Sequence, residues 1–313
     1  MTRTLAGGLA LAVLAATAGP DDKTPVFGVG LDLVNVTVTV RDQRGGLVPD
    51  LTVDDFVIRE DGRPEAIQVF APATAPEERA ELALNLGMLF DTSESMRKDL
   101  KLSQESAIRF LDAIPRARDL LLIFFDRDIR ISRYSSENQQ GIFGRILETK
   151  GEGFTALHDA IAVYLSRVAD THGRKVLVVF TDGDDTTSRV PAQEVQRLVR
   201  STDVTIYPVA FPGENPANAS ETLRARSFLN SLAELSGGRV FQPSASKELA
   251  AIYQSILDEL GTQYVLGYVS DNPKRDGKYR RITVELKRST LKVRHRPGYD
   301  APKDEPPKAA RRK

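Results

Sequence analysis

Between residues 82 and 260, short apolar runs alternate with amphipathic stretches, and this alternation constrains the fold more than any other feature. Four runs, LALNLGMLF, LLLIFF, KVLVVF and TIYPVAF, have the length and character of strands that are covered on both faces. The segments between them carry apolar residues at helical spacing, most cleanly at 156–170 and 246–260. The pattern therefore predicts the α/β class: a doubly wound, mostly parallel sheet with helices on both faces.

One apolar segment departs from this rhythm. The stretch IRISRYS follows LLLIFF after only a short turn, which is too short for the crossover that a parallel strand requires. We therefore expect IRISRYS to form an antiparallel strand at an edge of the sheet.

The two flanks of the α/β region, residues 26–72 and 262–300, show the period of two that is typical of half-buried strands. Each flank offers too few strands to form a stable sheet alone. We therefore predict that they pair as one β-sandwich-like module, with the α/β domain of residues 82–261 inserted between them. The residues expected to share the core of this module are Val34, Val36, Ile282 and Val284.

Both ends of the chain read as segments outside the folded modules. Residues 1–18 resemble a secretory signal peptide, with Arg3 before an apolar stretch and a small-residue cleavage site at 16–18. No later segment is apolar and long enough to span a bilayer, so we expect a secreted or periplasmic protein. Residues 301–313 form a charged, proline-containing tail that we expect to be disordered.

The composition excludes several functions. Lys plus Arg and Asp plus Glu both number 43, so no net charge indicates a nucleic-acid or membrane partner. The chain has no cysteine, which rules out disulfides, thiol nucleophiles and thiolate metal sites. Neither a Gly-x-Ser-x-Gly nor a His-Glu-x-x-His motif occurs, so we do not expect an enzyme.

Oxygen-bearing side chains follow the predicted strands. Asp91, Ser93 and Ser95 come directly after the first strand, Thr155 opens a helix, and Asp182 follows KVLVVF. Ligands of doubly wound sheets bind beyond the carboxyl ends of the strands, so these residues are expected at one edge. Hydroxyl and carboxylate oxygens suit a hard cation, and a small set completed by water suits Mg²⁺ better than Ca²⁺.

The order Asp-x-Ser-x-Ser, a distant Thr and a distant Asp-Gly resembles a von Willebrand factor type A domain with its metal-ion-dependent adhesion site. The flanks look like those of bacterial exported proteins related to this family. The resemblance implies binding of Mg²⁺ or Mn²⁺, with a carboxylate from a protein partner completing the coordination. The residues that match the family's ligands are Asp91, Ser93, Ser95, Thr155 and Asp182.

Residues beside these predicted ligands are expected to have other roles. Asp184 and Asp185 are expected in a solvated loop, with hydrogen bonding to the outer shell of the metal as the alternative. Glu94 and Arg97 are expected at the surface beside the site, where they could contact a partner. Phe154 stands where the family more often has a small residue, so it could narrow access to the ion.

The sequence thus predicts an exported binding or adhesion-type protein that engages an acidic side chain of a protein ligand through the ion. One alternative is a hydrolase or phosphatase that uses the same ion to activate water. A structural module with a vestigial ion is a third possibility. Taken singly, each residue also has an ordinary explanation: Ser93, Ser95 or Thr155 as a helix N-cap and Asp182 as part of a turn.

Overall fold

The computed structural model describes residues 33–72, 83–114, 119–135, 141–212, 219–243 and 246–303. The predicted signal peptide and most of the predicted tail lie outside the described residues. No helix within the described ranges combines the length and the apolar character needed to cross a membrane.

The α/β region contains a five-stranded sheet in the order β7-β6-β5-β8-β9. β5 (Leu84–Asp91) lies at its centre and pairs in parallel with β6 (Asp119–Phe125) and β8 (Arg174–Thr181), and β8 pairs in parallel with β9 (Val204–Ala210). β7 (Ile129–Ser135) pairs antiparallel with β6 at the edge, which confirms the prediction for IRISRYS.

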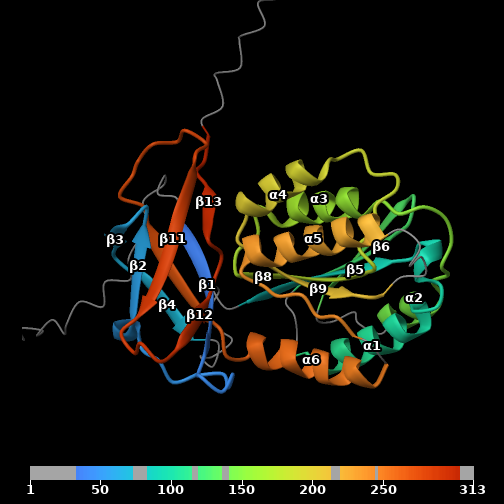
Figure 1. The fold of residues 1–313 in the computed structure, drawn as a ribbon, viewed down its shortest axis with the longest axis horizontal. Coiled ribbons are helices and arrows are strands. Elements are labelled where there is room, and N and C mark those ends of the chain that lie inside the picture. Colours follow the sequence, from blue (N-terminus) through green and yellow to red (C-terminus); the bar gives the residue numbers. More distant parts are fainter. Residues whose placement is uncertain are drawn as a thin grey trace, which may run out of the picture. The chain divides into compact units, whose positions relative to one another are not determined.

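Helices cover both faces of this sheet (Figure 1). Apolar side chains of α1, α2 and α6 pack on one face, against strand residues such as Phe90, and those of α3, α4 and α5 pack on the other, against residues such as Leu89. The helices are α1 (Leu100–Ala113), α2 (Ile142–Leu147), α3 (Leu157–Val168), α4 (Ala192–Arg200), α5 (Ala219–Ser236) and α6 (Ser246–Leu260). The doubly wound α/β fold is therefore confirmed.

A glycine in the central strand fixes the position of α3. A Cβ atom at Gly87 would lie 2.1 Å from the ring of Tyr164, which is fully buried in α3. The hydroxyl of Tyr164 donates a hydrogen bond of 3.0 Å to the carbonyl oxygen of Val176 in β8. Because α3 packs so closely on β5 and β8, the loop that enters it, with Thr155, lies near the ends of these strands.

The two flanks form a pair of four-stranded antiparallel sheets, in the orders β12-β1-β10-β4 and β13-β11-β2-β3. N-terminal strands pair with C-terminal ones, β1 with β10 and β2 with β11. The predicted core residues Val34, Val36, Ile282 and Val284 belong to one buried cluster, so the predicted pairing of the flanks is confirmed. The strands are β1 (Leu33–Arg41), β2 (Phe56–Glu60), β3 (Arg63–Glu65), β4 (Val69–Pro72), β10 (Tyr264–Val269), β11 (Tyr279–Leu286), β12 (Lys292–Arg294) and β13 (Gly298–Asp300).

Candidate metal centre at the carboxyl end of the sheet

Two aspartates meet at the carboxyl edge of the sheet. Asp91 is the last residue of β5 and Asp182 directly follows β8, and these two strands are parallel neighbours. Burial raises the pKa of Asp91 to about 7, and the negative charge of Asp182 contributes to the rise. The fold therefore brings together two residues that are far apart in sequence, as the strand pattern predicted.

Neutral groups hold the carboxylate of Asp91, which is 1% exposed. The hydroxyl of Thr181 donates to Oδ2 at 2.6 Å, and the backbone N–H of Ser93 donates to Oδ1 at 3.0 Å. Thr181 is fixed in turn, because its Oγ1 accepts a hydrogen bond of 2.9 Å from the N–H of Gly183. These contacts orient Asp91 without neutralising its charge.

The carboxylate of Asp182 is only partly satisfied. Its Oδ1 accepts a hydrogen bond of 3.1 Å from the N–H of Asp184, whereas its buried Oδ2 has no hydrogen-bond partner among the described residues. A buried carboxylate oxygen without a partner is costly, and a bound cation would remove that cost. The orphaned oxygen beside Asp91 therefore fits a divalent ion.

The two serines add hydroxyl oxygens to this edge. The Oγ atoms of Ser93 and Ser95 lie 3.1 Å apart, and Ser93 is buried. Ser93 is the N-cap residue of a short 3-10 turn, Glu94–Met96, but its side chain makes no capping hydrogen bond. Its hydroxyl thus contacts Ser95 and the carboxylate of Asp91 instead of the helix end.

Thr155 is buried and immediately precedes α3. The N-cap residue of α3 is Ala156, and the side chains that accept from its first-turn N–H groups are those of Asp185 and Ser188, so Thr155 does not have the capping role that was its alternative explanation. Its N–H donates to Oγ1 of Thr186 at 2.9 Å, and its carbonyl oxygen accepts from the N–H groups of Thr186 and Thr187 at 2.9 and 3.0 Å. The Thr155 loop is thereby tied to the loop that carries Asp182.

The Thr155 loop is also hydrogen-bonded to the segment after β5. The N–H of Glu94 donates to the carbonyl oxygen of Gly153 at 3.1 Å, and the N–H of Glu152 donates to that of Thr92 at 2.8 Å. A Cβ atom at Gly151 would lie 3.2 Å from the carbonyl oxygen of Ser93. The three loops with the predicted ligands therefore form one hydrogen-bonded unit.

Asp184 and Asp185 differ from each other. Burial raises the pKa of Asp184, and the negative charges of Asp182 and Glu221 add to the rise. The carboxylate of Asp185 accepts hydrogen bonds from the N–H of His158 at 3.2 Å and from the hydroxyl of Ser188 at 2.5 Å. Asp185 therefore holds the first turn of α3, a structural role that the interpretation as a solvated loop did not anticipate.

The rim of the site carries exposed charged residues and an exposed aromatic residue. Glu94 and Arg97 form an ion pair of 3.2 Å with both side chains largely exposed. Phe154 is 61% exposed, so its ring is available at the surface beside Thr155.

Sequence reasoning missed the residues that position the predicted ligands, above all Thr181 and Thr186. Thr181 directly precedes Asp182, and a hydroxyl residue at the last position of a buried strand could have served as a signal. Thr186 lies within a run of polar residues and offers no such signal, because its role depends on the approach of another loop.

The donor set fits a hard cation. It combines two carboxylates with three hydroxyls, which are oxygen ligands that Mg²⁺ and Mn²⁺ accept. In the described part of the chain, no three His, Cys, Asp or Glu side chains gather in a metal-binding arrangement. The predicted set is of another kind, because only two of its five members are carboxylates.

Fold and site together define an α/β domain that presents oxygen ligands at the carboxyl edge of its sheet. The model of the von Willebrand factor type A domain matches residues 85–255, more than half of the 313 residues, and the chain belongs to this family. The resemblance identified from the sequence is thereby confirmed. Domains of this family are generally non-enzymatic and mediate interactions between proteins.

Individual relatives are distant. The chain is 24% identical over 163 residues to the uncharacterized protein YwmD of Bacillus subtilis (strain 168), covering 45% of this chain and 72% of that protein. Among solved structures, the conserved hypothetical protein BatB from Bacteroides thetaiotaomicron superposes with a TM-score of 0.45 at 13% identity, over 56% of this chain and 98% of the other. A von Willebrand factor type A protein from Catenulispora acidiphila superposes with a TM-score of 0.47 at 11% identity, over 89% and 76%.

Proposed function

We propose that this chain is an exported binding protein whose type A domain holds Mg²⁺ or Mn²⁺ and engages an acidic side chain of a protein partner. The observation that carries the proposal is the buried Oδ2 of Asp182, which has no hydrogen-bond partner among the described residues and lies near the buried Asp91. The residues that would hold the ion are Asp91, Ser93, Ser95, Thr155 and Asp182.

The charges explain why a carboxylate would be the preferred ligand. Two aspartates balance a divalent ion, and the three hydroxyls add no charge, so the bound ion would supply a Lewis-acidic position that attracts another anionic oxygen. The chain contributes rigidity, because Thr181 and Thr186 hold two of the ligand-bearing loops in place. Glu94, Arg97 and Phe154 are exposed beside the predicted ligands and would contact the partner.

Isothermal titration calorimetry with MgCl₂ or MnCl₂ tests the metal site. We expect one ion per chain for the wild type and no measurable binding for Asp91→Ala. Asp170→Ala, at an exposed position beyond α3, is the matched control and should bind like the wild type. Equal binding by Asp91→Ala, or no binding by the wild type, would overturn the proposed site.

Affinity capture from the exported fraction of the source cells tests the partner. Partners held through the ion should be retained with MgCl₂, released by EDTA, and lost with Asp91→Ala. The alternative of a hydrolase predicts turnover of phosphate esters or peptides by the purified chain. Metal-dependent turnover that Asp91→Ala abolishes would favour that alternative.

Export is part of the same proposal and is supported by the sequence of residues 1–18. Expression of the full chain in a bacterial host should yield a processed protein outside the cytoplasm. N-terminal sequencing that finds Met1 on cytoplasmic protein alone would contradict it.

A further inference from the structure

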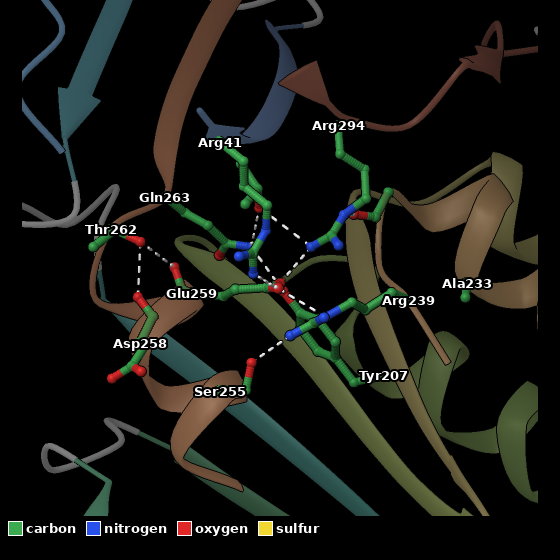
Figure 2. A network of polar contacts seen from close by, with 12 residues as sticks. Arg41, Tyr207, Ala233, Arg239, Ser255, Asp258, Glu259, Thr262, Gln263 and Arg294 are labelled. Atoms are coloured by element: carbon green, nitrogen blue, oxygen red, sulfur yellow. Dashed lines mark hydrogen bonds and ion pairs between the residues drawn. The ribbon is translucent and has the colours of Figure 1, made fainter. Parts of the chain in front are cut away.

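A buried carboxylate at the other end of the sheet is surrounded by cations (Figure 2). Glu259, in the last turn of α6, is 0% exposed. Its Oε1 forms ion pairs with Arg41 at 2.6 Å and with Arg239 at 2.8 Å. Its Oε2 accepts hydrogen bonds from Nη2 of Arg294 and, at 3.2 Å, from the hydroxyl of Tyr207.

This cluster holds more positive than negative charge, because three guanidinium groups share one carboxylate. Burial lowers the pKa of Arg239; Glu259 opposes this decrease, and the like charges of Arg41 and Arg294 add to it. The three arginines are each about one third exposed, so their excess charge faces solvent.

A cavity of about 430 Å³ lies next to this cluster. Arg41 and Arg294 line it together with two further cations, Arg44 and Lys292. The acidic residue in its wall is Asp42, whose Oδ1 already accepts hydrogen bonds of 2.8 Å from the backbone N–H groups of Arg44 and Gly46. Four cationic residues and one acidic residue therefore line the cavity.

We propose that this cavity, the Arg41–Arg294 pocket, binds a small organic anion that carries two or more negatively charged oxygens, either phosphorylated or polycarboxylic. Its volume lies in the range of small-molecule sites. Guanidinium groups bind phosphate and carboxylate oxygens with paired N–H donors. Arg41 is held by the carbonyl oxygen of Gly45 at 2.5 Å and Arg294 by that of Gly237 at 3.0 Å, so both are oriented before a ligand arrives.

The pocket is separate from the proposed metal centre. Gln263 Nε2 donates to the hydroxyl of Tyr207 at 2.8 Å, and its Oε1 accepts from Arg174 at 2.7 Å. Arg174 is the first residue of β8, whereas Asp182 follows the last. The arginine cluster therefore lies toward the amino ends of the strands, and a test of the pocket is independent of the metal.

Ligand binding should also stabilise the folded chain. Arg41 and Arg294 belong to β1 and β12, while Glu259 and Arg239 belong to the α/β region. An anion that neutralises the excess charge would favour the arrangement in which these four side chains meet, and binding to the native state alone raises the melting temperature.

The test uses the full chain with sodium phosphate and sodium citrate as probes, against sodium chloride at equal ionic strength. Calorimetry should detect saturable binding of at least one probe, and thermal unfolding should shift upward with it. Phosphate alone, or citrate alone, would identify the phosphorylated or the polycarboxylic class. Binding of neither probe would overturn the proposal.

A double variant, Arg44→Ala with Lys292→Ala, locates the binding. Both side chains are exposed and lie outside the set that holds Glu259, so the fold should be preserved. We expect affinity to fall by at least about tenfold while the ligand-free melting temperature stays unchanged. Lys278→Ala removes an 81% exposed cation elsewhere on the module and should bind like the wild type. Unchanged affinity in the double variant would show that the anion binds elsewhere.

Discussion

The buried carboxylates at the two ends of the central sheet differ in the charge of the groups around them. At the carboxyl end, Asp91 and Asp182 lie near each other, and Asp91 accepts hydrogen bonds from neutral donors, the hydroxyl of Thr181 and the N–H of Ser93. At the amino end, Glu259 alone receives three guanidinium groups and a tyrosine hydroxyl. A buried charge is tolerated only when it is compensated, so the proposed ion would compensate the first arrangement, whereas protein groups already compensate the second.

The β-sandwich-like module supports this distinction with a third buried acid. Glu60 is 3% exposed and accepts hydrogen bonds from the hydroxyls of Tyr268 at 2.8 Å and Tyr299 at 2.9 Å. Ser270 donates at 2.6 Å, and Arg280 forms an ion pair of 3.4 Å. Protein groups satisfy Glu60 as they satisfy Glu259, so the aspartate pair is the exception among these three sites.

The largest change in stability is expected for a substitution at the amino end of the sheet. Glu259→Gln leaves three partly buried arginines without their counter-charge, and breaking a buried ion pair from one side costs about 3 kcal/mol or more. We expect a corresponding decrease in the urea midpoint of the purified chain, followed by circular dichroism.

Glu285→Gln is the matched control, because Glu285 pairs with Arg59 at 3.2 Å but its side chain is 52% exposed. An exposed pair contributes about 1 kcal/mol or less. Equal shifts for the two variants would mean that Glu259 is no more important to stability than a surface acid.

At the carboxyl end, removing a buried acid should increase the stability of the chain, whereas at the amino end it decreases it. Asp182→Asn keeps the Oδ1 acceptor for Asp184, removes the negative charge beside Asp91, and replaces the unsatisfied Oδ2 by a donor. In EDTA we expect this variant to be more stable than the wild type by about 1 kcal/mol. With saturating MgCl₂ the order of stability should invert, because the proposed ion would bind and stabilise the wild type and not the variant.

Urea denaturation of the wild type and of Asp182→Asn, in EDTA and in MgCl₂, tests both expected differences in stability. Asp170→Asn should follow the wild type in each condition. A loss of stability in EDTA would show that the carboxylate of Asp182 is compensated by the protein, and the contrast between the two ends would fail.

The smallest expected effect is a pH dependence near the cation-rich end. Burial lowers the pKa of His295 below its ordinary value of 6.5, although a hydrogen bond with the carbonyl oxygen of Arg296 opposes the shift. Nε2 accepts from the N–H of Val284 at 3.2 Å, which requires the neutral ring. The unfolded chain therefore binds this proton more readily than the folded chain. The contribution of His295 to the free energy of unfolding is thus fully present above pH 6.5 and is lost as the pH falls below that value.

We expect His295 to account for at most about 1 kcal/mol of that decrease. His295→Gln should reduce the slope of the urea midpoint between pH 7.5 and the onset of acid unfolding. His172→Gln, at an exposed position, should leave the slope unchanged. If both variants keep the wild-type slope, protonation of His295 does not contribute.

Much of the fold could be predicted because its signals are local. Short, continuous apolar runs predicted β5, β6, β8 and β9 as strands buried on both faces. The short turn before β7 predicted that it is an antiparallel edge strand. The pairing of the flanks followed from a physical limit, since neither flank alone has enough strands for a stable sheet. The predicted ligands followed from the rule that parallel strands end at one edge.

By itself, the sequence thus determined the family and the two modules, and it predicted the five oxygen-bearing residues at the carboxyl edge of the sheet. Only the tertiary structure decided how each acid is compensated. Arg41 and Glu259 are 218 residues apart, and Thr181 reaches Asp91 across 90 residues, so no sequence period connects them. A charged residue looks the same in a sequence whether it will be buried with three cations or with another acid, because its free energy depends on neighbours that folding alone supplies.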